Sequence, residues 1–84
     1  MPETMTAKDA AAALGVSRPQ LSYLSETGQI LLQVNDGKAL ANTETVYRLW
    51  EAREAAKHRI SYRRRWRQGQ WETWARREAK KSPA

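Results

Sequence analysis

The sequence predicts a small, mainly α-helical domain with one β-hairpin and a long basic helix towards its C-terminal end. Three observations carry this prediction. Two short helical patterns joined by a glycine occupy residues 6–28, an Asp-Gly pair between apolar segments follows them, and a tract rich in Ala, Arg and Glu begins near residue 43. A chain of 84 residues is enough for one domain with a short appendage.

The first predicted helix begins after Thr6, whose side chain can cap the helix through the backbone of Asp9. Alanines and a leucine then recur at helical spacing. Gly15 ends the helix, because glycine adopts the left-handed conformation without strain. Ser17 and Gln20 form a second capping box, which begins the next helix. These residues predict two short helices joined by a tight turn.

This pattern resembles a helix-turn-helix. The small Ala11 lies where the two helices would cross closely, and Val16, Leu21 and Leu24 would fill the core. The resemblance implies that the second helix enters the major groove of duplex DNA. Arg suits guanine there and Gln suits adenine, because each pairs bidentately with its base. The expected base-reading residues are Ser17, Arg18, Gln20, Ser22 and Tyr23. The alternative is an ordinary helical hairpin with a solvated polar face.

A two-stranded β-wing is predicted after the helix pair. Residues 30–34 include β-compatible apolar residues, and Asp36-Gly37 is a strong turn signal because both positions tolerate a positive φ. Residues 39–41 would be the returning strand, although alanine is a poor strand former. Lys38 at the tip either contacts a DNA phosphate, enters the minor groove or is simply solvated.

A third helix is predicted to begin at Asn42 or Thr43, either of which can cap it. Val46, Leu49 and Trp50 share one face of this helix at spacings of three and four residues. That face can seal the helix pair and the wing. We therefore expect Trp50 in the core rather than at a ligand.

The order of these motifs carries a family resemblance. A turn beginning GVS, a wing with Asp-Gly and a helix beginning TVYRLWEARE are similar to the winged helix-turn-helix group of MerR-type regulators, phage excisionases and lambda-type terminase small subunits. The resemblance implies a DNA-binding domain over residues 5–56. Residues 38–54 are most similar to terminase small subunits, and residues 34–38 also resemble excisionase wings. Terminase small subunits are usually much longer, with a C-terminal part that engages the large subunit.

Residues 57–81 are predicted to form a basic, tryptophan-rich helical extension. Composition favours one continuous helix over residues 43–68, roughly 39 Å long at 1.5 Å per residue. Gly69 then allows a break before a further helix over residues 70–80.

Positive charge is concentrated in the second half of the chain. The net charge is +6, yet residues 1–42 carry three basic and four acidic side chains, whereas residues 43–84 carry twelve and five. Phosphate attraction grows with the number of cations near the backbone, so the basic half would supply much of the affinity. The expected backbone contacts are Lys38, Lys57, Arg59, Arg63, Arg64, Arg65 and Arg67.

Aromatic residues form two stripes along the predicted extension, at helical spacing. Exposed aromatic stripes on a small domain mark association surfaces. Each large ring can bury roughly 150–250 Å² in such a contact. The expected oligomer or partner residues are Tyr62, Trp66, Trp71 and Trp74. The alternative is that these rings pack back onto their own domain.

No catalytic residue, metal ligand or cofactor site is predicted. The chain has one histidine and no cysteine, and neither metal-ligand spacing nor a Gly-rich phosphate loop is present. The N-terminus lacks the pattern of a signal peptide, and the longest apolar run is too short to span a bilayer. We therefore expect a soluble protein in the cytoplasm of a bacterial host cell.

These observations predict a non-enzymatic protein of a phage or mobile element that binds duplex DNA as a homodimer or higher oligomer. The favoured role is DNA packaging, as a short protein similar to a terminase small subunit or as one that partners such a subunit and redirects it. The alternative is an excisionase or a MerR-like transcriptional regulator. A further alternative is RNA binding through the Arg-rich helix, or docking on another DNA-binding protein.

Overall fold

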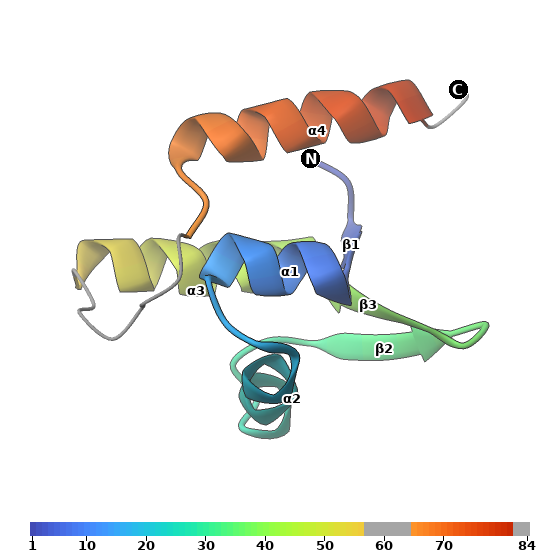
Figure 1. The fold of residues 1–84 in the computed structure, drawn as a ribbon, viewed down its shortest axis with the longest axis vertical. Coiled ribbons are helices and arrows are strands. Elements are labelled where there is room, and N and C mark those ends of the chain that lie inside the picture. Colours follow the sequence, from blue (N-terminus) through green and yellow to red (C-terminus); the bar gives the residue numbers. More distant parts are fainter. Residues whose placement is uncertain (57–64, 82–84) are drawn as a thin grey trace.

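The structure is a computed structural model that describes residues 1–56 and 65–81 as four helices and one three-stranded sheet. The helices α1 and α3 lie in a central layer, with α2 on one side and α4 on the other (Figure 1). The predicted class, a mainly helical domain with a hairpin and a C-terminal helix, is confirmed, and the arrangement is compatible with a winged helix. The elements in chain order are β1 (Thr4–Thr6), α1 (Ala7–Leu14), α2 (Arg18–Glu26), β2 (Leu32–Asn35), β3 (Lys38–Asn42), α3 (Thr43–Ala55) and α4 (Gln68–Lys81).

The ends of α1 and α2 form as their local sequence predicts. The Thr6 hydroxyl oxygen accepts a hydrogen bond from the backbone N–H of Asp9 at 3.1 Å, which caps α1. Gly15 ends α1 with a φ of 67°, in the left-handed region that favours glycine. Ser17 and Gln20 complete the capping box of α2. The turn between the helices is therefore fixed by residues within it.

The wing is part of a three-stranded antiparallel sheet with the strand order β1-β3-β2. Asp36 and Gly37 have φ values of 51° and 77°, as a two-residue hairpin turn requires. The prediction of a two-stranded wing missed β1, which pairs with the other side of β3. Met5 at the middle of β1 lies opposite Ala41 and is buried.

The predicted continuous helix over residues 43–68 is wrong. The helix α3 ends at Ala55, residues 65–67 are not helical, and Gly69 lies inside α4 rather than at a break. Two hydrogen bonds hold the segment before α4 against the helical layer. The Trp66 N–H donates to the Ala13 carbonyl at 3.0 Å, and the Trp50 indole N–H donates to the Trp66 carbonyl at 2.6 Å. These tertiary contacts outweigh the helical propensity of the tract.

Four tryptophans form one aromatic cluster between α4 and the helical layer. Trp71 and Trp74 are each 1% exposed and belong to the same core as the buried residues of α1, α2 and α3. The Trp71 ring meets those of Trp50, Trp66 and Trp74 edge-on, with centroids 5.0–5.9 Å apart. The Trp74 indole N–H donates to Asp9 Oδ2 at 3.2 Å.

This packing corrects the expectation that the aromatic stripe is exposed for association. Trp71 and Trp74 are buried within their own chain, and Trp66 is half-buried against them. The argument for a dimer through these rings required them to be exposed, and it therefore no longer holds for Trp71 and Trp74. Tyr62 lies outside the described residues.

Substituting the two buried indoles separately tests the bond that joins α4 to α1. Trp74→Phe leaves Asp9 without its donor, and a hydrogen bond to a charged group is worth about 1.5–3 kcal/mol. Trp71→Phe removes an indole N–H that has no partner among the described residues. We expect Trp74→Phe to lower the free energy of unfolding in urea by about 1–2 kcal/mol more than Trp71→Phe does. Equal losses would show that the bond to Asp9 contributes nothing.

Candidate nucleic-acid interface

The outer face of α2 is polar and exposed. Leu21 and Leu24 point into the core, so the opposite side of the helix faces outward. Tyr23 is 63% exposed there, although it is a large aromatic residue. Arg18 and Ser22 are also exposed. Gln20 is exposed too, so four of the five expected base-reading residues lie at the surface, and the fifth, Ser17, is half-buried at the cap.

Both ends of α2 are braced by hydrogen bonds. At its C-terminal end, the Gly28 N–H donates to the Ser25 carbonyl and the Gln29 N–H donates to the Leu24 carbonyl. This is the pair of bonds that a Schellman motif makes, and Gly28 has the positive φ of 81° that the motif favours. The helix is thus held rigidly enough to present a fixed pattern of side chains.

The side chain of Gln20 has a structural role that competes with base reading. Its Oε1 accepts from the Ser17 N–H at 3.0 Å and lies 3.3 Å from the Ser17 hydroxyl. Bidentate pairing with adenine needs the same oxygen together with the amide N–H. Gln20 must therefore give up its half of the capping box to read adenine in this way.

The wing places Lys38 at an exposed hairpin tip, directly opposite Asn35 in the sheet. The neighbouring Asp36 is also exposed and offsets the charge of Lys38. Both β2 and α2 lie on the same side of the α1–α3 layer (Figure 1). Val34 on β2 is 76% exposed, so the wing offers an apolar contact as well as a cation.

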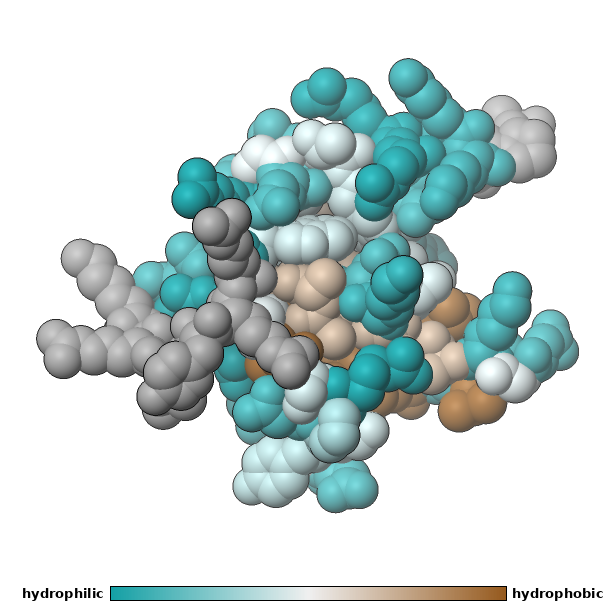
Figure 2. All heavy atoms as spheres, viewed as in Figure 1, coloured by the Kyte–Doolittle hydropathy of each residue, from teal (hydrophilic) through white to brown (hydrophobic). Residues whose placement is uncertain are grey.

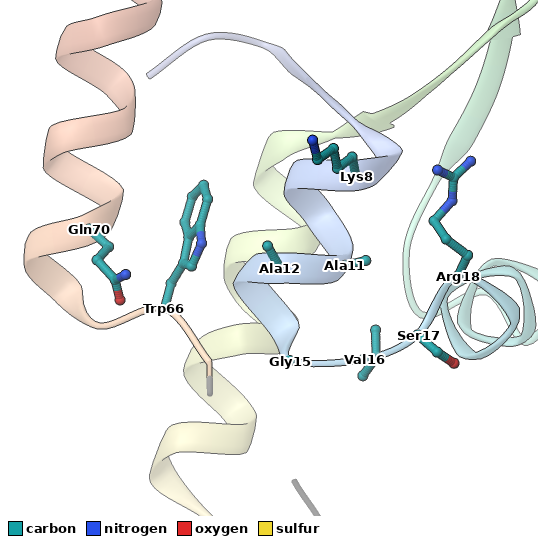
Figure 3. Close-up of a pocket in the computed structure, with 9 residues that line it drawn as sticks. All are labelled: Lys8, Ala11, Ala12, Gly15, Val16, Ser17, Arg18, Trp66 and Gln70. Carbon is teal, nitrogen blue, oxygen red and sulfur yellow. The ribbon is translucent and has the colours of Figure 1, made fainter. Parts of the chain in front are cut away.

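A groove of about 450 Å³ crosses the outer face of α1, between Trp66 on one side and the start of α2 on the other (Figure 3). Between Lys8 and Gly15, α1 contributes the small side chains of Ala11 and Ala12 to the groove. Lys8 and Arg18 place two exposed cations along it. The lining residues are Lys8, Ala11, Ala12, Gly15, Val16, Ser17, Arg18, Trp66 and Gln70.

The sequence prediction missed Lys8 and the part that Trp66 plays in the groove. Lys8 and Ala12 lie four residues apart, so they share the outward face of α1. From that spacing, the position of Lys8 on the outward face of the helix could have been predicted from the sequence. The position of Trp66 depends on its bond to Ala13, which no local pattern indicates.

The structure describes two arginines of the predicted basic cluster, Arg65 and Arg67, and they differ in exposure. Arg65 is engaged in the fold, because its Nε lies 3.2 Å from Glu54 Oε1 and its side chain is 18% exposed. Burial, followed by the nearby charge of Arg65, lowers the pKa of Arg53. Arg65 is thus poorly placed to contact a DNA backbone, whereas Arg67 is exposed. The other expected contacts of this cluster, Lys57, Arg59, Arg63 and Arg64, lie outside the described residues.

Comparison of the chain with protein-family models, with curated proteins and with solved structures finds no match. Within residues 1–56 and 65–81, no three His, Cys, Asp or Glu side chains gather as metal ligands. None of the helices in this described part is long and apolar enough to cross a membrane.

Two substitutions separate the capping role of Gln20 from base reading. Ser17→Ala removes the cap and should lower the free energy of unfolding by about 1 kcal/mol. Gln20→Glu keeps a capping box of the Ser-x-x-Glu kind, so stability should change by less than about 0.5 kcal/mol. The base preferences of Gln20→Glu, measured by selection from a random duplex library, should match those of the wild type. A lost preference for adenine at one position would instead assign base reading to Gln20.

Proposed function

We propose that the chain binds duplex DNA, with α2 in the major groove and the wing beside the flanking backbone. The observation that carries this proposal is the exposed polar face of α2, on a helix that is capped at both ends and anchored by Leu21 and Leu24. A helix with its side chains is about 10–12 Å across, and the major groove is about 12 Å wide.

Side chains of different chemistry would make different contacts with the duplex. The Arg18 guanidinium matches the two acceptors of guanine, and the Tyr23 ring can contact a thymine methyl group. Lys8 in the groove and Lys38 on the wing suit phosphates on either side. The dipole of α2 adds a partial positive charge at the start of the helix.

Among duplex-binding roles, we propose DNA packaging in a phage or mobile element, in the manner of a terminase small subunit or of a protein that partners and redirects one. The likeness of residues 38–54 to such subunits supports this role. Mass spectrometry of proteins co-purified from an infected or induced host tests it. A terminase subunit among them is the expected result, whereas a recombinase or RNA polymerase would favour the excisionase or regulator role.

Two single substitutions distinguish base reading from backbone contact. The selected site is the sequence that the wild type enriches from a random duplex library. Arg18→Ala should weaken binding at the selected site by about 1–3 kcal/mol and reduce discrimination against random duplex. Lys8→Gln should weaken binding to all sequences alike, and the slope of log affinity against log salt should become shallower by about one. Fluorescence anisotropy at several salt concentrations measures both effects.

Equal losses for Arg18→Ala on selected and random duplex would make Arg18 a phosphate contact. Stronger binding of the wild type to structured RNA than to duplex DNA in the same assay would replace this proposal with the RNA alternative.

A further inference from the structure

The helix α4 has a buried face and a strongly cationic exposed face. Trp71 and Trp74 point into the core, and Ala75 and Glu78 are half-buried beside them. At 100° per residue, the opposite side of the helix is centred near residue 80. We define the α4 crest as Thr73, Arg76, Arg77 and Lys80, which are exposed on that side together with Gly69 and Glu72.

The three cations of the crest outnumber its one acidic neighbour, Glu72, which is exposed one turn before Arg76. No ion pair engages Arg76, Arg77 or Lys80 among residues 1–56 and 65–81. Glu78 is turned towards the core side with its side chain 25% exposed, and its Oε2 lies 3.8 Å from Lys81 Nζ. Residues 65–81 carry six basic and two acidic side chains, whereas residues 1–56 carry five and seven.

The helix α4 lies on the side of the molecule opposite to α2, across the α1–α3 layer (Figure 1), and the crest is on the side of α4 away from its buried tryptophans. Hydrophilic residues cover α4 in the space-filling view, and a more hydrophobic strip separates them from α2 (Figure 2). The bonds from Trp74 to Asp9 and from Trp66 to Ala13 fix this orientation. A straight duplex held by α2 therefore cannot also contact the crest.

We propose that the α4 crest binds the phosphate backbone of a second DNA segment, so that one molecule bridges two duplexes. This inference rests on the proposed function, because α2 must hold the first duplex. Arg76 and Lys80 are neighbours one turn apart, and with Arg77 they present three cations to a polyanion. Contacts of this kind attract phosphates without reading sequence. DNA held at α2 also raises the local concentration of further segments at the crest.

Capture of a second duplex tests the bridge. One biotinylated duplex carrying the selected site is immobilised on beads with the protein, and a fluorescent random duplex is added. The wild type should retain the fluorescent duplex, and the triple variant Arg76→Gln/Arg77→Gln/Lys80→Gln should retain at least about tenfold less. Binding of the first duplex should change by less than about threefold. The melting temperature of the triple variant should match that of the wild type, because all three side chains are exposed.

Two further variants serve as controls. Arg48→Gln removes an exposed arginine from α3 that is paired with Glu44, and it should leave capture unchanged. Thr73→Lys adds a cation within the crest and should increase capture severalfold. Capture that increases with Thr73→Lys and does not change with Arg48→Gln would locate the second DNA segment on α4.

Three outcomes would overturn the bridge. The wild type could capture no second duplex while Arg18→Ala still weakens binding of the first, in which case the proposed function stands alone. The triple variant could capture as much as the wild type, which would mean that two copies bridge through α2. The triple variant could instead lose only its binding to phosphatidylglycerol vesicles, which would assign the crest to an anionic membrane surface. Loss of first-duplex binding in the triple variant but not in Arg18→Ala would contradict the proposed function itself.

Discussion

Packing of four tryptophans against one another, three of them buried and Trp66 half-buried, is the constraint on which the rest of the structure depends. Five of the thirteen buried hydrophobic residues within residues 1–56 are alanines, among them Ala10, Ala11 and Ala13. A core of this size supplies little stability in a chain of 84 residues. Trp71 and Trp74 add two large rings to it, and they meet the other rings edge-on. The indole N–H of Trp74 is also directed at a polar partner, because it donates to the Asp9 carboxylate.

That packing decides where the two polar surfaces of the molecule lie. Because the tryptophan side of α4 faces the α1–α3 layer, Arg76, Arg77 and Lys80 of α4 face away from it and from α2. The recognition surface proposed on α2 therefore lies on the opposite side of the molecule from α4. Among residues 1–56 and 65–81, the exposed cations assigned to the proposed interface are Lys8, Arg18 and Lys38. The proposed bridge between two DNA segments rests on this separation of the proposed base-reading face of α2 from the cations of the α4 crest.

Features set by neighbouring residues could be predicted from the sequence. The caps at Thr6 and Ser17, the left-handed Gly15 and the Asp36-Gly37 turn depend on backbone conformations that a few residues determine. Burial of Trp50 followed from helical periodicity. The strand β1 could not be predicted, because it has three residues and is held by pairing with β3. The end of α3 and the burial of the C-terminal tryptophans depend on contacts that span more than fifty residues. The same holds within the site, where Trp66 lines the groove only because of such a contact.

Hydrogen exchange of the four indole N–H groups in the free protein, followed by NMR, tests the docking of α4 most directly. The indole protons of Trp50 and Trp74 are bonded to the Trp66 carbonyl and to Asp9, and that of Trp71 is buried. All three should exchange much more slowly with D2O than an exposed indole, and Asp9→Ala should speed the exchange at Trp74 most. Rapid exchange at Trp71 and Trp74, at the rate of exposed indoles, would mean that α4 is not docked and would contradict the account.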